Sequence, residues 1–174
     1  MTTANKLTFL RILLVPAFLV VLYLDFPRAD WVALAIFILA SVTDTLDGYV
    51  ARSRNQVTNL GKFMDPLADK ILVVTAMCWF VENGHMAGWL VAAVLIREFA
   101  VSGLRLMALE RGKVIAAAWS GKIKTAATMV CICLMLVFHH RWLDIVCQVV
   151  ILTTTLVSGA EYFVKNRKIF RTGR

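Results

Sequence analysis

Apolar residues fill six long stretches of this 174-residue chain, and polar residues gather in short breaks between them. The stretches cover residues 7–24, 31–50, 63–81, 86–109, 114–138 and 142–164. Each approaches or exceeds the ~20 residues that an α-helix needs to cross the hydrocarbon core of a bilayer. No break is long enough to form a second domain. The pattern therefore predicts one domain over residues 1–174, an all-α integral membrane protein built as a bundle of six transmembrane helices.

Composition strengthens the membrane prediction. Hydrophobic residues make up 60% of the chain and the mean hydropathy is +0.74, whereas soluble domains contain about 45–50% apolar residues. The first apolar run follows Lys6 and Arg11 without a small-residue cleavage site, so it is interpreted as a membrane span and not as a signal peptide. All four cysteines lie in apolar stretches, where cysteine is usually a small buried hydrophobe, so neither disulfides nor zinc is expected.

The basic residues are distributed unevenly over the two sides that six spans would create. With the N-terminus in the cytoplasm, only Arg28 and Arg141 lie on the far side, and thirteen Lys and Arg residues lie on the cytoplasmic side. The thirteen are Lys6, Arg11, Arg52, Arg54, Lys62, Arg105, Arg111, Lys113, Lys165, Arg167, Lys168, Arg171 and Arg174. This asymmetry predicts that both termini are cytoplasmic. The net charge of +8 then indicates contact with anionic lipid headgroups and not with nucleic acid.

Four further cations, Lys70, Arg97, Lys122 and Lys124, lie inside the apolar stretches. A lone charge in such a place costs at least ~2.5–3.5 kcal/mol on membrane-insertion scales. These side chains are therefore expected to face a polar cavity.

Four aspartates flank the break between the second and third stretches: Asp44 and Asp47 before it, Asp65 and Asp69 after it. At ~100° per helical residue, each pair lies on one face of its helix, so two acidic faces converge across a short loop. Four carboxylates in a small volume would repel one another and raise each other's pKa unless cations lay between them. Oxygen-only ligation suits Mg²⁺, Mn²⁺ or Ca²⁺, and Mg²⁺ readily takes substrate phosphates as further ligands. The cluster therefore indicates metal-assisted phosphoryl chemistry.

Three small residues, Gly48, Ala51 and Gly61, lie beside these carboxylates and leave room for a flat or bulky ligand. Any one of the aspartates alone could equally be a helix cap or a surface charge. Asp65, which precedes Pro66, could also mark the start of a helix.

The whole segment resembles the signature of the CDP-alcohol phosphatidyltransferase family, D-x2-D-G-x2-A-R-x8-G-x3-D-x3-D, which residues 44–69 match at every specified position. The resemblance implies transfer of a phosphatidyl group from CDP-diacylglycerol to an alcohol. It further implies a homodimer in the bacterial inner membrane, with the active site facing the cytoplasm. The carried-over ligands for two Mg²⁺ or Mn²⁺ ions are Asp44, Asp47 and Asp65, with Asp69 as general base. Asp69 is also counted as a candidate metal ligand, and Asp65 as a candidate catalytic residue. The carried-over nucleotide contacts are Gly48, Ala51, Gly61 and Arg52.

The chemistry of these residue types agrees with those roles. A metal ion that bridges the diphosphate polarises the phosphorus under attack, and the forked guanidinium of Arg52 suits phosphate oxygens. Asp69, one helical turn beyond Asp65, could accept the proton of an attacking hydroxyl. Direct displacement is favoured because a metal-bound carboxylate is a poor nucleophile, although a covalent phosphatidyl-aspartate remains an alternative.

Polar residues also mark the start of the first span. Asn5, Thr8 and Arg11 are spaced at i, i+3 and i+6, which could be a helix cap followed by an interfacial arginine. The same pattern resembles the start of bacterial members of the family, in which it lies close to the nucleotide. Asn5 and Thr8 are therefore predicted to help bind the nucleotide.

Basic residues of the fourth and fifth stretches suggest the nature of the acceptor. Arg97, Arg105, Lys122 and Lys124 face the single nearby acid Glu98. An Arg97–Glu98 ion pair could be purely structural, but the surplus charge favours an anionic acceptor such as a phosphate monoester. Both segments resemble those of family members that use sn-glycerol 3-phosphate. Serine, inositol and inositol phosphate remain alternatives.

A divalent-cation transporter is the competing class of function, because intramembrane carboxylates also line ion pathways. Two features argue against it. The aspartates cluster beside one loop instead of at the bilayer midplane, and the nearby cations would repel a passing metal ion. No internal repeat of the kind common in transporters is found either.

Overall fold

The computed structural model describes the backbone of residues 3–24, 26–53, 59–110 and 118–167, and side chains within 13–24, 26–43, 70–110 and 118–167. All regular secondary structure in these ranges is α-helical, which confirms the all-α prediction. The helices are α1 (Thr3–Tyr23), α2 (Ala29–Ser53), α3 (Asn59–Glu82), α4 (Gly88–Glu110), α5 (Trp119–Val137) and α6 (Arg141–Lys165). The largest difference from the predicted stretches is at α5, which begins at Trp119 because Ala118 adopts an extended conformation (φ −69°, ψ 149°).

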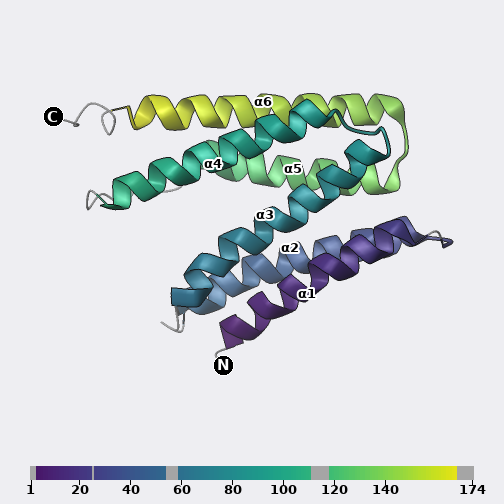
Figure 1. Cartoon of the computed structure of the whole chain (residues 1–174), viewed down its shortest axis with the longest axis horizontal. Helices are drawn as coiled ribbons and strands as arrows, with labels where there is room; N and C mark the ends of the chain where they lie inside the picture. Colours follow the sequence, from purple (N-terminus) through teal and green to yellow (C-terminus); the bar gives the residue numbers. More distant parts are fainter. Residues whose placement is uncertain (1–2, 25, 54–58, 111–117, 168–174) are drawn as a thin grey trace.

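The six helices alternate in direction, so that both termini lie toward the same end of the molecule (Figure 1). The starts of α1, α3 and α5 and the ends of α2, α4 and α6 are at the left of Figure 1, and the opposite helix ends are at the right. One right-hand connection, between α3 and α4, includes Gly84 at φ +75°, a left-handed conformation that glycine adopts without a steric penalty. This topology brings the two helices of the aspartate motif and the basic halves of α4 and α5 to one end.

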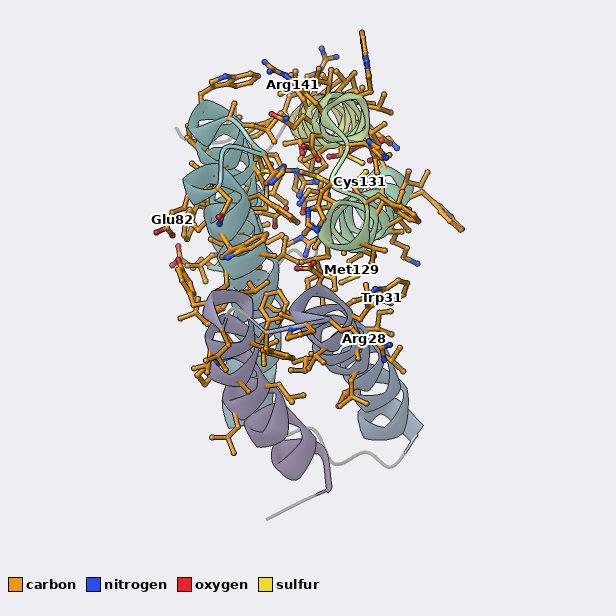
Figure 2. All side chains as sticks on the ribbon, turned by 90° about the vertical axis from the view of Figure 1, so that its right-hand side faces the viewer. Arg28, Trp31, Glu82, Met129, Cys131 and Arg141 are labelled. Carbon is orange, nitrogen blue, oxygen red and sulfur yellow. The ribbon has the colours of Figure 1, made fainter. Side chains whose placement is uncertain are left out.

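The helices pack most closely as the pairs α1–α2 and α5–α6, with α2 also against α5 and α4 against α6. One large apolar core joins helices across these pairs, for example through Phe37, Phe80 and Ile132, which are fully buried. Figure 2, viewed along the bundle from the right-hand end of Figure 1, shows Met129 between α5 and α2, and Met129 packs against this core. A second, smaller cluster between α4 and α6 contains Val101 and Tyr162.

Much of the helical surface is apolar and exposed. Within the described side chains, α5 and α6 are long and apolar enough to cross a membrane, with mean hydropathies of 1.5 and 1.7. Only 33% of each of these apolar windows is buried within the chain, whereas a core helix of a soluble protein would be mostly buried. Large residues such as Phe99 and Trp142 point outward at 72% and 81% exposure. Such exposure is typical of helices that face lipid.

Candidate functional site

The aspartate motif occupies the last turns of α2 and the first turns of α3, on either side of residues 54–58. Its backbone is helical on both sides, as the spacing argument required. Asn5 and Thr8 lie in the first turns of α1, at the same end of the bundle. The side chains of the predicted metal-binding, catalytic and nucleotide-binding residues lie outside the described set, so the convergence of these side chains stays a prediction. The residues concerned are Asn5, Thr8, Asp44, Asp47, Gly48, Ala51, Arg52, Gly61, Asp65 and Asp69.

A charged cluster near the middle of α3 and α4 also includes a residue of α5, and we call its members, Lys70, Arg97, Glu98 and Lys124, the Glu98 cluster. Glu98 Oε1 accepts hydrogen bonds from Arg97 Nη1 at 2.9 Å and from Lys124 Nζ at 2.8 Å. Glu98 Oε2 lies 3.6 Å from Lys70 Nζ. Among the described side chains, three cations therefore share one carboxylate, and these four side chains carry a net charge of +2.

The cations of the Glu98 cluster are largely shielded from water. The side chain of Lys124 is 6% exposed and that of Arg97 is 12% exposed, against 35% for Lys70. Charges with little water around them interact more strongly than charges on a surface. The Glu98 cluster can therefore attract an anion, and its carboxylate keeps the cations in place when no anion is bound.

Lys70 connects this cluster to the motif helix. It directly follows Asp69 in α3, and its Nζ also donates a 2.8 Å hydrogen bond to Ser102 Oγ of α4. The sequence identified Lys70 as a charge within an apolar stretch but gave no reason to assign it to the acceptor side. Its partners Glu98 and Ser102 are four residues apart in α4, hence on one face, which is the signal that could have revealed the link.

A cavity of about 300 Å³ adjoins the Glu98 cluster between α3, α4 and α5. Lys70, Glu98 and Lys124 line its polar part, and residues such as Val94 and Phe99 line the rest. Lys70 and Lys124 thus line a cavity, but most of its lining is apolar, so the expected polar cavity stays a prediction.

The other two predicted acceptor-binding cations contact aromatic rings. Arg105 Nε donates a 2.9 Å hydrogen bond to the hydroxyl of Tyr162, and its guanidinium carbon lies 5.5 Å from the centre of that ring. Lys122 Nζ lies 5.3 Å from the centre of the Trp119 ring. Arg97 and Lys124 therefore both contact Glu98, whereas Arg105 and Lys122 contact the rings of Tyr162 and Trp119.

Metal ligation is predicted for the four aspartates of the motif, whose side chains lie outside the described set. Among the described side chains, no group of three or more His, Cys, Asp and Glu residues could hold a metal ion. The four motif aspartates lie on helical backbone at spacings that put each pair on one face of its helix. Their all-oxygen donor set fits Mg²⁺ or Mn²⁺.

Comparison with known proteins places this arrangement in a family. The model of the family described as CDP-alcohol phosphatidyltransferase matches residues 1–160. The chain belongs to the CDP-alcohol phosphatidyltransferase family. This membership makes it a transferase and accounts for the complete match of residues 44–69 to the family signature.

Relatives within the CDP-alcohol phosphatidyltransferase family share one name. A Bacillus subtilis (strain 168) protein is 39% identical over 187 residues, covering 97% of this chain and 96% of the relative. A Salmonella paratyphi A protein is 41% identical over 143 residues, covering 79% and 78%, and a Shigella flexneri serotype 5b protein is 40% identical over 145 residues, covering 80% and 79%. Each is named CDP-diacylglycerol–glycerol-3-phosphate 3-phosphatidyltransferase.

Proposed function

We propose that the chain transfers the phosphatidyl group of CDP-diacylglycerol to sn-glycerol 3-phosphate, giving phosphatidylglycerophosphate and CMP. The observation that carries this proposal is the excess of positive charge in the Glu98 cluster, which adjoins the motif helix through Lys70. An acceptor with a phosphate group complements that charge. The name shared by relatives that align with most of the chain supports the same acceptor.

The charge of the cluster also weighs against the alternatives. Serine and inositol carry no phosphate to offset the net positive charge of the Glu98 cluster, whereas inositol phosphate would satisfy the same charge and is the second candidate acceptor. A divalent-cation pathway is disfavoured because a metal ion would be repelled by Lys70, Arg97 and Lys124.

For the motif, we assign the metal ligands as Asp44, Asp47, Asp65 and Asp69, with two Mg²⁺ or Mn²⁺ ions as the bound metals. When bound, such ions neutralise the diphosphate and stabilise the departing CMP. Arg52 pairs with diphosphate oxygens, and the nucleotide approaches the backbone at Gly48, Ala51 and Gly61. Asn5 and Thr8 border the nucleotide from α1. These assignments are supported by the match to the family signature and by the helical backbone that carries it.

The proposed reaction is a displacement at phosphorus. The hydroxyl oxygen of the acceptor forms a bond to the phosphorus that bears the diacylglycerol, and the bond from that phosphorus to the CMP oxygen breaks. The hydroxyl proton passes to the carboxylate of Asp69. Arg97, Arg105, Lys122 and Lys124 hold the phosphate of the acceptor during this step and so orient its hydroxyl.

We further propose that all six helices span the bacterial inner membrane, with both termini and the active site on the cytoplasmic side. The alternating helix directions and the exposed apolar surfaces support this arrangement, as does the distribution of Lys and Arg. A homodimer is the expected assembly, on the basis of the family resemblance.

The decisive experiment is an acceptor panel. Protein purified in detergent is supplied with CDP-diacylglycerol and Mg²⁺, and CMP release is measured with glycerol 3-phosphate, serine, inositol or inositol phosphate. Release with glycerol 3-phosphate alone supports the proposal. A preference for another acceptor would reject the assignment of the acceptor, and an absence of CMP release with every acceptor would reject the proposed activity.

A further inference from the structure

We infer that α6 positions the acceptor-binding arginines of α4, through Gly159 for Arg97 and through Tyr162 for Arg105. This inference rests on the proposed function, because the arginines matter as binding groups only if they hold the acceptor phosphate. None of the substrate-binding residues predicted from the sequence lies on α6.

Gly159 gives Arg97 the space that its side chain occupies. Gly159 is buried, and a Cβ atom added there would lie 3.3 Å from Arg97 Cγ. That separation is tighter than an ordinary van der Waals contact, and the neighbour is the stem of Arg97, so a methyl group would require this stem to shift by a few tenths of an ångström. A Cβ at Gly121 of α5 would lie 3.7 Å from Arg97 Nη2, an ordinary contact distance. Arg97 therefore passes Gly159 with its stem and Gly121 with its end, and its Nη1 donates a hydrogen bond to Glu98.

Tyr162 fixes Arg105 by two contacts at once. Its hydroxyl accepts the 2.9 Å hydrogen bond from Arg105 Nε, and its ring lies beneath the guanidinium at 5.5 Å. Tyr162 is 2% exposed and packs in an apolar cluster with Val101 and Leu104 of α4, so its hydroxyl has a fixed position. Because the hydrogen bond uses Nε, the terminal nitrogens Nη1 and Nη2 are the donors that a phosphate would meet.

The two contacts belong to one interface. Gly159 and Tyr162 are three residues apart and share a face of α6. Arg97 and Arg105 are eight residues apart, about 80° around α4, so they share a side of that helix, and α4 packs against α6. A helix without predicted substrate contacts of its own thus determines where two guanidinium groups lie.

The test separates acceptor binding from nucleotide binding. Tyr162→Phe keeps the ring and its packing but removes the hydroxyl, and Gly159→Ala adds the one methyl group that meets Arg97. Tyr162→Phe should raise the KM for glycerol 3-phosphate by about two- to tenfold, the worth of one hydrogen bond. Gly159→Ala should raise the same KM by shifting Arg97, and both variants should leave the KM for CDP-diacylglycerol unchanged. Tyr23→Phe is the matched control, because it removes a hydroxyl that is bonded to Glu82 at the opposite end of the bundle.

Each outcome is decisive for the inference. A selective rise in the acceptor KM in Tyr162→Phe, absent in Tyr23→Phe, supports the positioning role. Equal changes in both KM values, or unchanged kinetics in folded Tyr162→Phe, would overturn it. If Gly159→Ala fails to fold, Tyr162→Phe still decides, because its shape is conserved. Wild-type protein that is inactive with glycerol 3-phosphate would instead reject the proposed function, which the acceptor panel detects independently.

Discussion

Lys124 and Glu98 form a nearly buried ion pair between α5 and α4, with 2.8 Å between Lys124 Nζ and Glu98 Oε1. The same carboxylate also holds Arg97 and lies 3.6 Å from Lys70. Glu98 is thus the common counter-charge for cations from three helices. If the charge of Glu98 were removed, Lys70, Arg97 and Lys124 would repel one another where little water surrounds them.

Glu98→Gln should therefore destabilise the protein. The amide can still accept one hydrogen bond but offers no charge, and loss of one partner of a buried ion pair costs about 3 kcal/mol. The measurement is thermal unfolding in detergent. Glu161→Gln is the matched control, because Glu161 is paired with Lys165 one turn away on an exposed helix surface, where such pairs contribute little. A melting temperature for Glu98→Gln equal to that of the control would contradict the role of Glu98 as common counter-charge.

Two neighbouring lysines of α5 should differ in their effect on acceptor binding. Lys124 belongs to the Glu98 cluster and lines the 300 Å³ cavity, whereas Lys122 lies over the Trp119 ring. Lys124→Gln should raise the KM for glycerol 3-phosphate roughly ten- to a hundredfold, since it removes a charge-assisted bond worth about 1.5–3 kcal/mol. Lys122→Gln should give a smaller rise. Steady-state kinetics with each substrate varied in turn would measure both effects, and an unchanged acceptor KM in Lys124→Gln would remove that residue from the acceptor site.

The hydrophobic pattern was sufficient to predict the helices, because each apolar stretch is long and the breaks between stretches are short and polar. The predicted stretch begins at residue 114, whereas α5 begins at Trp119. Ala118 in an extended conformation shows where the helix begins. Without a capping residue, the composition of the sequence does not show where a helix such as α5 begins.

The sequence predicted the charged residues of the candidate site, but it did not predict the contacts between them that depend on how the helices pack. Arg97 and Lys124 were both identified from their charge. Their shared carboxylate, and the entry of Lys70 into the cluster, depend on how α3, α4 and α5 meet. Gly159 and Tyr162 gave no signal, because a glycine and a tyrosine in an apolar helix are ordinary core residues until a charged neighbour is seen against them.

Topology can be tested by labelling single cysteines in intact cells. In a background lacking Cys78, Cys131, Cys133 and Cys147, a cysteine at Asn55 or Gly173 should react only when the reagent reaches the cytoplasm. A cysteine at Asn83, an exposed position at the α3–α4 turn at the opposite end of the bundle, should react from outside. Labelling of Asn55 and Asn83 positions from the same side would contradict the spanning arrangement.

Metal dependence is the remaining property of the proposed site. Asp65→Asn keeps the size of the side chain but removes one anionic ligand, so activity should fall by orders of magnitude while the protein still inserts and folds. Asp30→Asn provides a matched control, since Asp30 lies at the start of α2, at the opposite end of that helix from the motif.

Chelation gives the same test without mutation. Excess EDTA should abolish turnover by the wild-type protein, and added Mg²⁺ or Mn²⁺ should restore it, whereas Ca²⁺, which tolerates looser geometry at longer distances, should restore it less well. Because unbound motif carboxylates would repel one another, removal of the metal should also lower the melting temperature of the wild type, and this loss should be smaller in Asp65→Asn, which carries one negative charge fewer. Full turnover in excess EDTA, after prolonged dialysis, would refute the assignment of the metal to these aspartates.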